Sequence, residues 1–222
     1  MNDIKTAALF DLTRSVASPL LESCEYPWQA LKQIGDFVVS LGKTLSRSEY
    51  YSPSENVWIA NDVIIPHNAT IIGPAIIESG TEIRPGAYIR GKVIVGKGCV
   101  IGNSCEIKNS IIFDSVQIPH FNYVGDSIFG YKAHTGAGAI TSNIKNDGTN
   151  VAVLYDGKRI ETGLRKFGAI LGDGVQIGCN TVLNPGTVIG KNTNVYPLSS
   201  VRGVVPSESI YKSFDNIVPK IK

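Results

Sequence analysis

The chain has 222 residues, 43% of them hydrophobic, which is enough for one large domain or for one domain with a small appendage. Its 21 Lys and Arg residues nearly balance 19 Asp and Glu residues, and the formal charge of +2 argues against a nucleic-acid binder that works by bulk charge. Charged residues make up only 18% of the chain and Gly is abundant, so the composition favours β structure with many tight turns.

Residues 1–50 contain no repeat and are expected to form a helical cap. Between residues 27 and 41, apolar side chains recur at helical spacing, and Pro27 suits the first turn of a helix. Such a helix would cover the sheet edge at one end of a repeat structure, and contact with substrate or with another subunit is the alternative. No signal peptide or membrane span is recognisable, and four Cys residues without a CxxC pair favour a reducing, cytoplasmic setting.

A six-residue repeat dominates residues 51–206. A large apolar residue returns at every sixth position from Ile59 to Phe113 and again from Leu171 to Val201, and the position four residues further on is mostly small or β-branched. A period of six fits neither a helix nor an alternating strand. It describes a chain that turns a corner after each short segment, with three corners to a coil of about 18 residues, and it predicts a triangular parallel β-helix.

The repeat slips in phase between its two tracts, and polar residues gather there. Phe129 follows the preceding large apolar residue after five positions instead of six. His120 and His134 lie within PHFNYVGDS and AHTGAGAITSN around this slip, whereas His67 lies in an ordinary hexad and is expected on a surface corner. The pKa of an unperturbed His is near neutral, which suits a general base. His120 is therefore a candidate base, and the alternative is that it fills a corner.

Two further segments depart from the repeat. Residues 144–165 indicate a β-hairpin with a turn at Asp156 and Gly157, which projects from a corner of the β-helix. Such an insertion is usually functional or an oligomer contact. Residues 207–222 are expected to form a short capping helix or an exposed end.

The hexads, PHFNYVGDS and HTGAGAITSN together make the chain resemble a known family, the C-terminal acetyltransferase domain of the bifunctional N-acetylglucosamine-1-phosphate uridyltransferase/glucosamine-1-phosphate acetyltransferase. Archaeal sugar-phosphate relatives are similar too. The resemblance covers about residues 57–205. It implies a left-handed β-helix that transfers acetyl from acetyl-CoA to an amino-sugar phosphate, in the cytoplasmic route to UDP-N-acetylglucosamine. The first 50 residues cannot hold the family's nucleotidyltransferase domain, so a stand-alone acetyltransferase without uridyl transfer is expected.

The resemblance also implies a role for each matching residue. His120 would take a proton from the sugar amine, Glu106 would orient its ring, and Asn143 would complete the catalytic group. The other implied contacts are Arg90, Lys108, Tyr123, His134 and Lys166 for the acceptor, and Ala137, Cys179 and Pro197 for acetyl-CoA. Backbone N–H groups of the Gly-Ala-Gly corner could approach the thioester oxygen closely, and no metal is required.

Several positions depart from the family pattern. His134 stands where the family commonly has Asn, Ile144 replaces a Tyr, Cys179 a Ser and Pro197 an Ala. The acceptor could therefore be glucosamine 1-phosphate, galactosamine 1-phosphate or a nucleotide-linked amine.

Two other functions compete with the transferase. One is a non-catalytic β-helix subunit that binds a sugar phosphate, a sugar nucleotide or a nucleotidyltransferase partner. The other is a zinc hydrolyase of the same fold, which the wide spacing of the three His residues disfavours. Proteins of the resembled family are usually trimers with the site between neighbouring β-helices, so a homotrimer is expected, with neither nucleic acid nor membrane as a partner.

Overall fold

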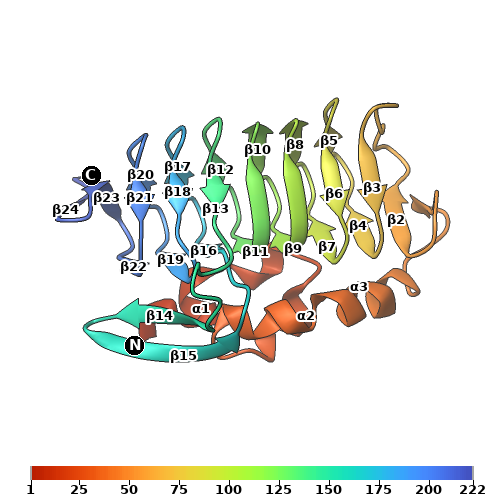
Figure 1. The fold of residues 1–222 in the computed structure, drawn as a ribbon. Helices are drawn as coiled ribbons and strands as arrows, with labels where there is room; N and C mark the ends of the chain where they lie inside the picture. The colour runs from red at the N-terminus through yellow and green to blue at the C-terminus, as the bar shows by residue number, and fades with distance from the viewer. Residues whose placement is uncertain (1, 222) are drawn as a thin grey trace.

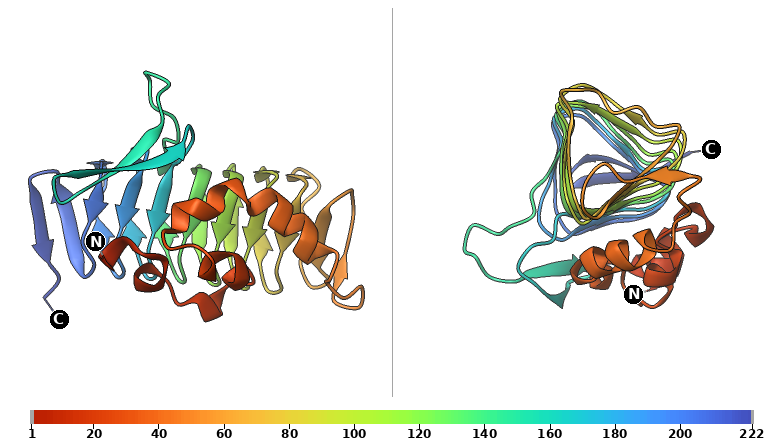
Figure 2. Two further views of the ribbon diagram at one scale, coloured as in Figure 1. Left: turned by 90° about the horizontal axis from the view of Figure 1, so that it is seen from below. Right: turned by 90° about the vertical axis from the view of Figure 1, so that its right-hand side faces the viewer.

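The six-residue repeat forms the inward-facing rows of a triangular, left-handed parallel β-helix (Figures 1 and 2). Residues 2–221 are described by a computed structural model. Large apolar residues of successive coils stack along the axis, and Ile77, Ile89, Val95, Ile101 and Ile107 are fully buried. Burying each such side chain stabilises the fold by about 1.5–3 kcal/mol.

Three parallel sheets form the sides of the prism. The site face contains β3 (Thr70–Ile72), β6 (Tyr88–Arg90), the first halves of β9 (Glu106–Ile112) and β11 (Tyr123–Phe129), β13 (Ile140–Thr141), β18 (Val182–Leu183) and β21 (Ser200–Val201). The helix-covered face contains β2 (Val57–Ala60), β4 (Ala75–Ile77), β7 (Val93–Val95), the second halves of β9 and β11, β16 (Ala169–Leu171), β19 (Thr187–Ile189) and β22 (Val204–Val205). The open face contains β5 (Glu82–Ile83), β8 (Val100–Asn103), β10 (Gln117–His120), β12 (His134–Thr135), β17 (Gln176–Ile177), β20 (Asn194–Val195) and β23 (Ser209–Ser213).

The coils shorten by one residue at the edge between the site face and the helix-covered face. Ile77 pairs with Val95, but Val95 pairs with Ile112 instead of the Phe113 that the six-residue count selects. Phe113 turns toward the N-terminal segment and packs on Phe10, with ring centroids 4.9 Å apart.

The shortened turns contain Asn109 and Asp126, which face each other in the register of β9 and β11. Both have positive φ, at 46° and 51°, the left-handed conformation that Asn and Asp tolerate better than most residues. The five-residue step from Val124 to Phe129 contains Asp126, so the slip is confirmed there, whereas counting in sixes misses a second slip at Asn109. The expectation that His120 lies at a slip is wrong, because His120 sits within regular six-residue steps.

A layer of short helices lies along the helix-covered face instead of over one end of the β-helix, so the predicted position of the cap is wrong (Figures 1 and 2). Its elements are η1 (Asn2–Ile4), α1 (Thr6–Leu9), η2 (Leu12–Arg14), α2 (Ser18–Glu22), η3 (Pro27–Lys32) and α3 (Ile34–Gly42). The apolar stripe of Trp28, Leu31, Ile34 and Val38 is buried against β4, β7, β9 and β11. A whole sheet face offers this stripe more apolar surface than one terminal coil would, and the short strand β1 (Tyr50–Tyr51) pairs with β2 at the end.

The predicted hairpin is confirmed as β14 (Val151–Tyr155) and β15 (Lys158–Leu164), with Asp156 and Gly157 at positive φ in its turn. It lies beside the N-terminal layer, and the Tyr155 hydroxyl donates to Asp3 at 3.0 Å (Figure 1). At the C-terminus, β23 joins the open face and β24 (Asn216–Pro219) folds back antiparallel on it. A strand pair thus replaces the expected helix or exposed end, since one more strand satisfies the backbone of the last coil. Within residues 2–221, every helix is too short or too polar to cross a membrane.

Candidate active site

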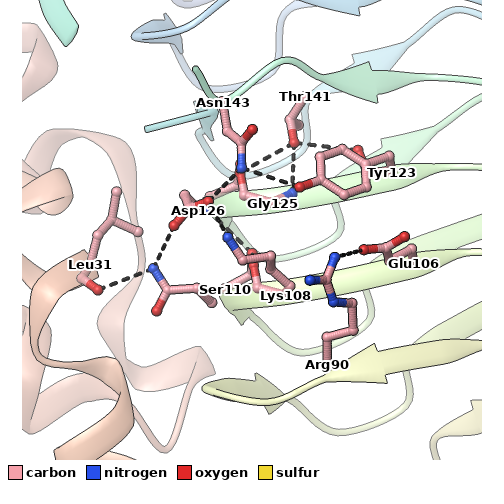
Figure 3. Close-up of polar contacts among 12 residues, drawn as sticks. Leu31, Arg90, Glu106, Lys108, Ser110, Tyr123, Gly125, Asp126, Thr141 and Asn143 are labelled. Atoms are coloured by element: carbon pink, nitrogen blue, oxygen red, sulfur yellow. Dashed lines mark hydrogen bonds and ion pairs between the residues drawn. The ribbon is translucent and has the colours of Figure 1, made fainter. Parts of the chain in front are cut away.

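Five predicted site residues gather on the site face because successive coils stack in register (Figure 3). Glu106 of β9 pairs with Tyr123 of β11, so their side chains form one outward row. Tyr88 of β6 pairs with Glu106 in the same row. Arg90 lies two residues after Tyr88, and Lys108 lies two residues after Glu106, so these two cations begin the neighbouring row. Asn143 follows β13 and reaches the same edge, where its side-chain amide donates to the Tyr123 hydroxyl at 3.2 Å.

A buried carboxylate that the sequence analysis did not select joins these residues. Asp126 is 5% exposed, and its Oδ2 accepts from the Lys108 ammonium at 3.0 Å and from the Asn143 amide. Its Oδ1 accepts from Asn109 Nδ2 at 2.9 Å, and the same amide also donates to the Leu31 carbonyl of η3 at 3.3 Å. Asp126 therefore connects two neighbouring coils, and Asn109 extends the network to the N-terminal layer.

The charges of the cluster cancel in pairs. The Arg90 guanidinium binds Glu106, whose side chain is about one-third exposed, and Lys108 binds Asp126 in a much less exposed pair. The predicted role of Glu106 in orienting the His120 ring finds no support, because the Glu106 carboxylate is turned to Arg90. The reason is the register, which brings Glu106 and Arg90 onto one face while β10 carries His120 on another.

His120 lies at the last position of β10, exposed, at the corner that leads onto the site face. The turn runs through Phe121, with φ of 54°, and the buried Asn122 before Tyr123 begins β11. Asn122 holds this corner, since its Nδ2 donates to the Gly136 carbonyl at 2.8 Å and its Oδ1 accepts from the His120 N–H at 3.3 Å. The imidazole is thus carried by a rigid corner of the coil that also bears Tyr123.

The three predicted acetyl-CoA contacts continue the same corner along the axis. The Gly138 N–H donates to the His120 carbonyl at 3.1 Å, the Asn180 N–H to the Ala137 carbonyl at 2.8 Å, and the Leu198 N–H to the Cys179 carbonyl at 2.9 Å. In each bond the N–H belongs to the residue just after the position equivalent to the acceptor, as the register of β10, β12, β17 and β20 shows. One column therefore contains His120, Ala137, Cys179 and Pro197.

His134 and Lys166 lie outside the cluster. His134 is half-buried on β12 of the open face and shares a hollow with Gln117, Lys132 and Gln176. Burial lowers the pKa of His134. Lys166 is exposed at the base of the hairpin, directly before Phe167, whose N–H donates to the Asn143 carbonyl at 2.9 Å. The residue next to Lys166 is therefore bonded to the main chain of the cluster residue Asn143.

Sequence reasoning missed Asp126, Asn109 and Asn122 as parts of this site. Asp126 stands inside the motif PHFNYVGDS, so the motif itself was the available signal for it. Asn109 carries no motif, and only the shortened turn brings it to Asp126. A hollow of about 300 Å³ is lined by Ser142 and Ile144, the two chain neighbours of Asn143, and by Lys145, Asn184 and Arg202, among others. Across residues 2–221 we find no group of three or more His, Cys, Asp or Glu side chains able to hold a metal ion.

Comparison with known proteins finds one matching domain family and similar segments in bifunctional proteins. The GMPPB C-terminal domain family matches residues 71–217. A bifunctional sugar-1-phosphate nucleotidylyltransferase/acetyltransferase of Sulfurisphaera tokodaii is 41% identical over 88 residues, covering 40% of this chain and 22% of the relative. The bifunctional protein GlmU of Methanococcus aeolicus is 38% identical over 176 residues, covering 71% of this chain and 43% of the relative. The chain thus spans less than half the length of these curated relatives.

Among solved structures, the product of the BC4754 gene of Bacillus cereus has the same fold. Its TM-score is 0.54 at 16% sequence identity, covering 70% of this chain and 85% of the other. At this identity the likeness concerns the β-helix architecture alone.

Proposed function

The chain belongs to the GMPPB C-terminal domain family, and on that premise we propose that it is an acetyl-CoA-dependent N-acetyltransferase acting on an amino-sugar phosphate such as glucosamine 1-phosphate. The name of the Sulfurisphaera tokodaii relative supports this proposal, since it describes an acetyltransferase that also acts on a sugar 1-phosphate. The match covers only 22% of that relative, so the proposal is limited to acyl transfer.

One observation carries the proposal: an exposed imidazole at a corner adjoins a polar cluster on the face that begins there. His120 and Tyr123 lie three residues apart around the corner, and Tyr123 is bonded to Asn143. A base, a set of polar groups for a sugar and two cations for a phosphate are thus provided by adjacent coils.

The charge pattern of the cluster suits an acceptor with both signs of charge. An amino-sugar phosphate carries an ammonium and a phosphate before reaction. Arg90 and Lys108 supply cations, and Glu106 and Asp126 supply carboxylates, so the array has no net charge. A zwitterion can exchange partners with such pairs, and Arg90 with Glu106 are its more exposed members. The Arg90 guanidinium offers a planar fork to phosphate oxygens.

The reaction follows from these positions. The neutral amine attacks the thioester carbonyl carbon, so a C–N bond forms and, as the intermediate collapses, the C–S bond breaks. His120 accepts the proton that the positively charged nitrogen must lose. The coenzyme A thiolate leaves and takes up that proton, which restores the neutral imidazole. The products are an N-acetylated sugar phosphate and free coenzyme A thiol.

The corner at residues 136–138 stacks on His120 in the next coil, and it can stabilise the negative charge that develops on the thioester oxygen. The N–H groups of Gly136 and Gly138 are used in bonds to Ile177 and His120. The N–H of Ala137 between them makes no hydrogen bond to any residue from 2 to 221. A fixed, unused donor at this place is what an oxyanion requires. Cys179 and Pro197 continue the column and would line the path of the pantetheine arm.

The acceptor can be identified by release of free thiol from acetyl-CoA. The full-length chain is incubated with glucosamine 1-phosphate, galactosamine 1-phosphate and a nucleotide-linked amino sugar, and the products are identified by mass. We expect thiol release with at least one amine and a product 42 Da heavier than the acceptor, the mass that an acetyl group adds. Thiol release equal to the background hydrolysis for every amine would contradict the proposal and favour a non-catalytic, ligand-binding β-helix.

A further inference from the structure

We propose that Asp126 is a positioning residue of the acceptor site, which turns the side-chain amide of Asn143 so that its carbonyl oxygen faces the amine of the acceptor. The inference rests on the proposed function for the identity of the acceptor. It assigns a role to a buried carboxylate at the corner where the sequence repeat takes a five-residue step.

The orientation of Asn143 follows from the chemistry of its two partners. An ionised carboxylate accepts hydrogen bonds and cannot donate them. Asn143 therefore has to present its NH₂ group to Asp126 Oδ2, and the same NH₂ group also donates to the Tyr123 hydroxyl at 3.2 Å. Both N–H bonds are then used. Asn143 Oδ1 remains as the outward group, and it can only accept.

Asp126 is itself held from several sides, so the orientation is rigid. Lys108 donates to Oδ2 and Asn109 to Oδ1, and the Asp126 main-chain carbonyl accepts from the Gly168 N–H at 2.9 Å. Asn109 is fixed in turn by the Leu31 carbonyl of the N-terminal layer. The carboxylate is thereby locked between two coils, the base of the hairpin and the helical layer.

An outward carbonyl oxygen selects an acceptor with a strong donor. The ammonium or amine of an amino sugar donates to it, and the hydrogen bond is strengthened when the donor is charged. The hydroxyl of the corresponding neutral sugar gives a weaker bond. The geometry thus makes Asn143 a contributor to amine selectivity and Asp126 the group that enforces it.

The test compares binding of glucosamine 1-phosphate and glucose 1-phosphate to the full-length chain by calorimetry. The unmodified chain should bind the amino sugar more tightly. Asp126→Asn can present either end of its amide, so the ratio of the two affinities should fall about three- to tenfold. Asp173→Asn is the matched control, because Asp173 accepts from the Asp11 N–H at 2.7 Å and from the Tyr131 N–H, yet lies away from Asn143. It should leave the ratio unchanged.

An unchanged ratio of the two affinities in Asp126→Asn overturns the inference. So does the absence of any preference for the amino sugar in the unmodified chain. Should Asp126→Asn fail to fold, Asn109→Ala loosens the same carboxylate and should lower the ratio less, and an unchanged ratio there also overturns it. Amine-selective binding that Asp126→Asn abolishes, in a chain that releases no thiol from acetyl-CoA, would uphold this inference while rejecting acetyl transfer.

Discussion

His134 illustrates how burial sets the behaviour of single residues in this fold. Its ring is half-buried among Gln117, Lys132 and Gln176, and burial lowers the pKa of His134 because the charged imidazolium loses hydration. The neutral ring contributes stability that is present above the pKa of the unfolded chain, near 6.5, and is lost as the pH falls through the lower pKa of the folded state.

Replacement of His134 should therefore flatten the acid side of the stability profile. His134→Asn keeps a polar group and removes the titration, so its melting temperature should fall less between pH 7 and pH 5 than that of the unmodified chain. Thermal unfolding at several pH values measures this difference. His67→Asn, at an exposed corner, is the control and should follow the unmodified profile. Parallel profiles for all three chains would contradict the assignment.

The motif residues of the site were predictable from the sequence, and their partners were not. Tyr123 and Asn143 belong to motifs that could be read directly, and both join the cluster. The pairing of Glu106 with Arg90 depends on the register of two coils, which the repeat count alone does not assign to faces. The five-residue step from Val124 to Phe129 marks the turn at Asp126 but does not indicate its contacts with Lys108, Asn143 and Asn109.

At the scale of elements, the hexads predicted the core, the Asp156-Gly157 turn predicted the hairpin and helical spacing predicted the N-terminal helices, while the position of these helices required the structure. Stacked positions such as Ile89 and Ile107 are buried because each coil repeats the same corner. The position of the helical layer follows from long-range packing, which no local pattern encodes. Trp28 shows this dependence, as its ring lies 4.7 Å from Tyr26 of its own layer and 5.9 Å from Phe167 beside the hairpin.

Removal of the Trp28 ring should therefore destabilise the whole domain. Trp28 is 2% exposed, and Trp28→Ala should cost about 3–5 kcal/mol in the free energy of unfolding, because a large cavity remains between layer and β-helix. Denaturant unfolding measures this loss. Trp28→Phe keeps an aromatic ring at the place and should cost clearly less. Equal stability of the alanine variant and the unmodified chain would show that the layer is not part of the same folding unit.

At the scale of the whole molecule, the site face and its corner carry exposed apolar side chains. Tyr88, Ile140 and Val182 form an outward row on the site face, and Phe121 and Leu198 project from the corner, with Leu198 80% exposed. Apolar surface of this kind commonly marks an interface. It supports the proposal of a homotrimer in which the corner of one β-helix meets the site face of the next.

A trimer has a simple signature in solution. Light scattering coupled to size exclusion should give about three times the 23.8 kDa mass of one chain. Leu198→Asp places a charge in the proposed interface and should shift the distribution toward smaller species, whereas Leu154→Asp, on the exposed hairpin, should leave it unchanged. A single monomer mass for the unmodified chain would contradict the trimer.

Acetyl transfer as proposed for this chain depends on His120 acting as the base. The most direct measurement is the kcat for thiol release by His120→Ala, with the best amino-sugar phosphate as acceptor and His67→Ala as the control. We predict a loss of about 10²–10⁴-fold in kcat for His120→Ala, with an unchanged fold by circular dichroism, and full activity for His67→Ala. Undiminished turnover in folded His120→Ala would contradict the account.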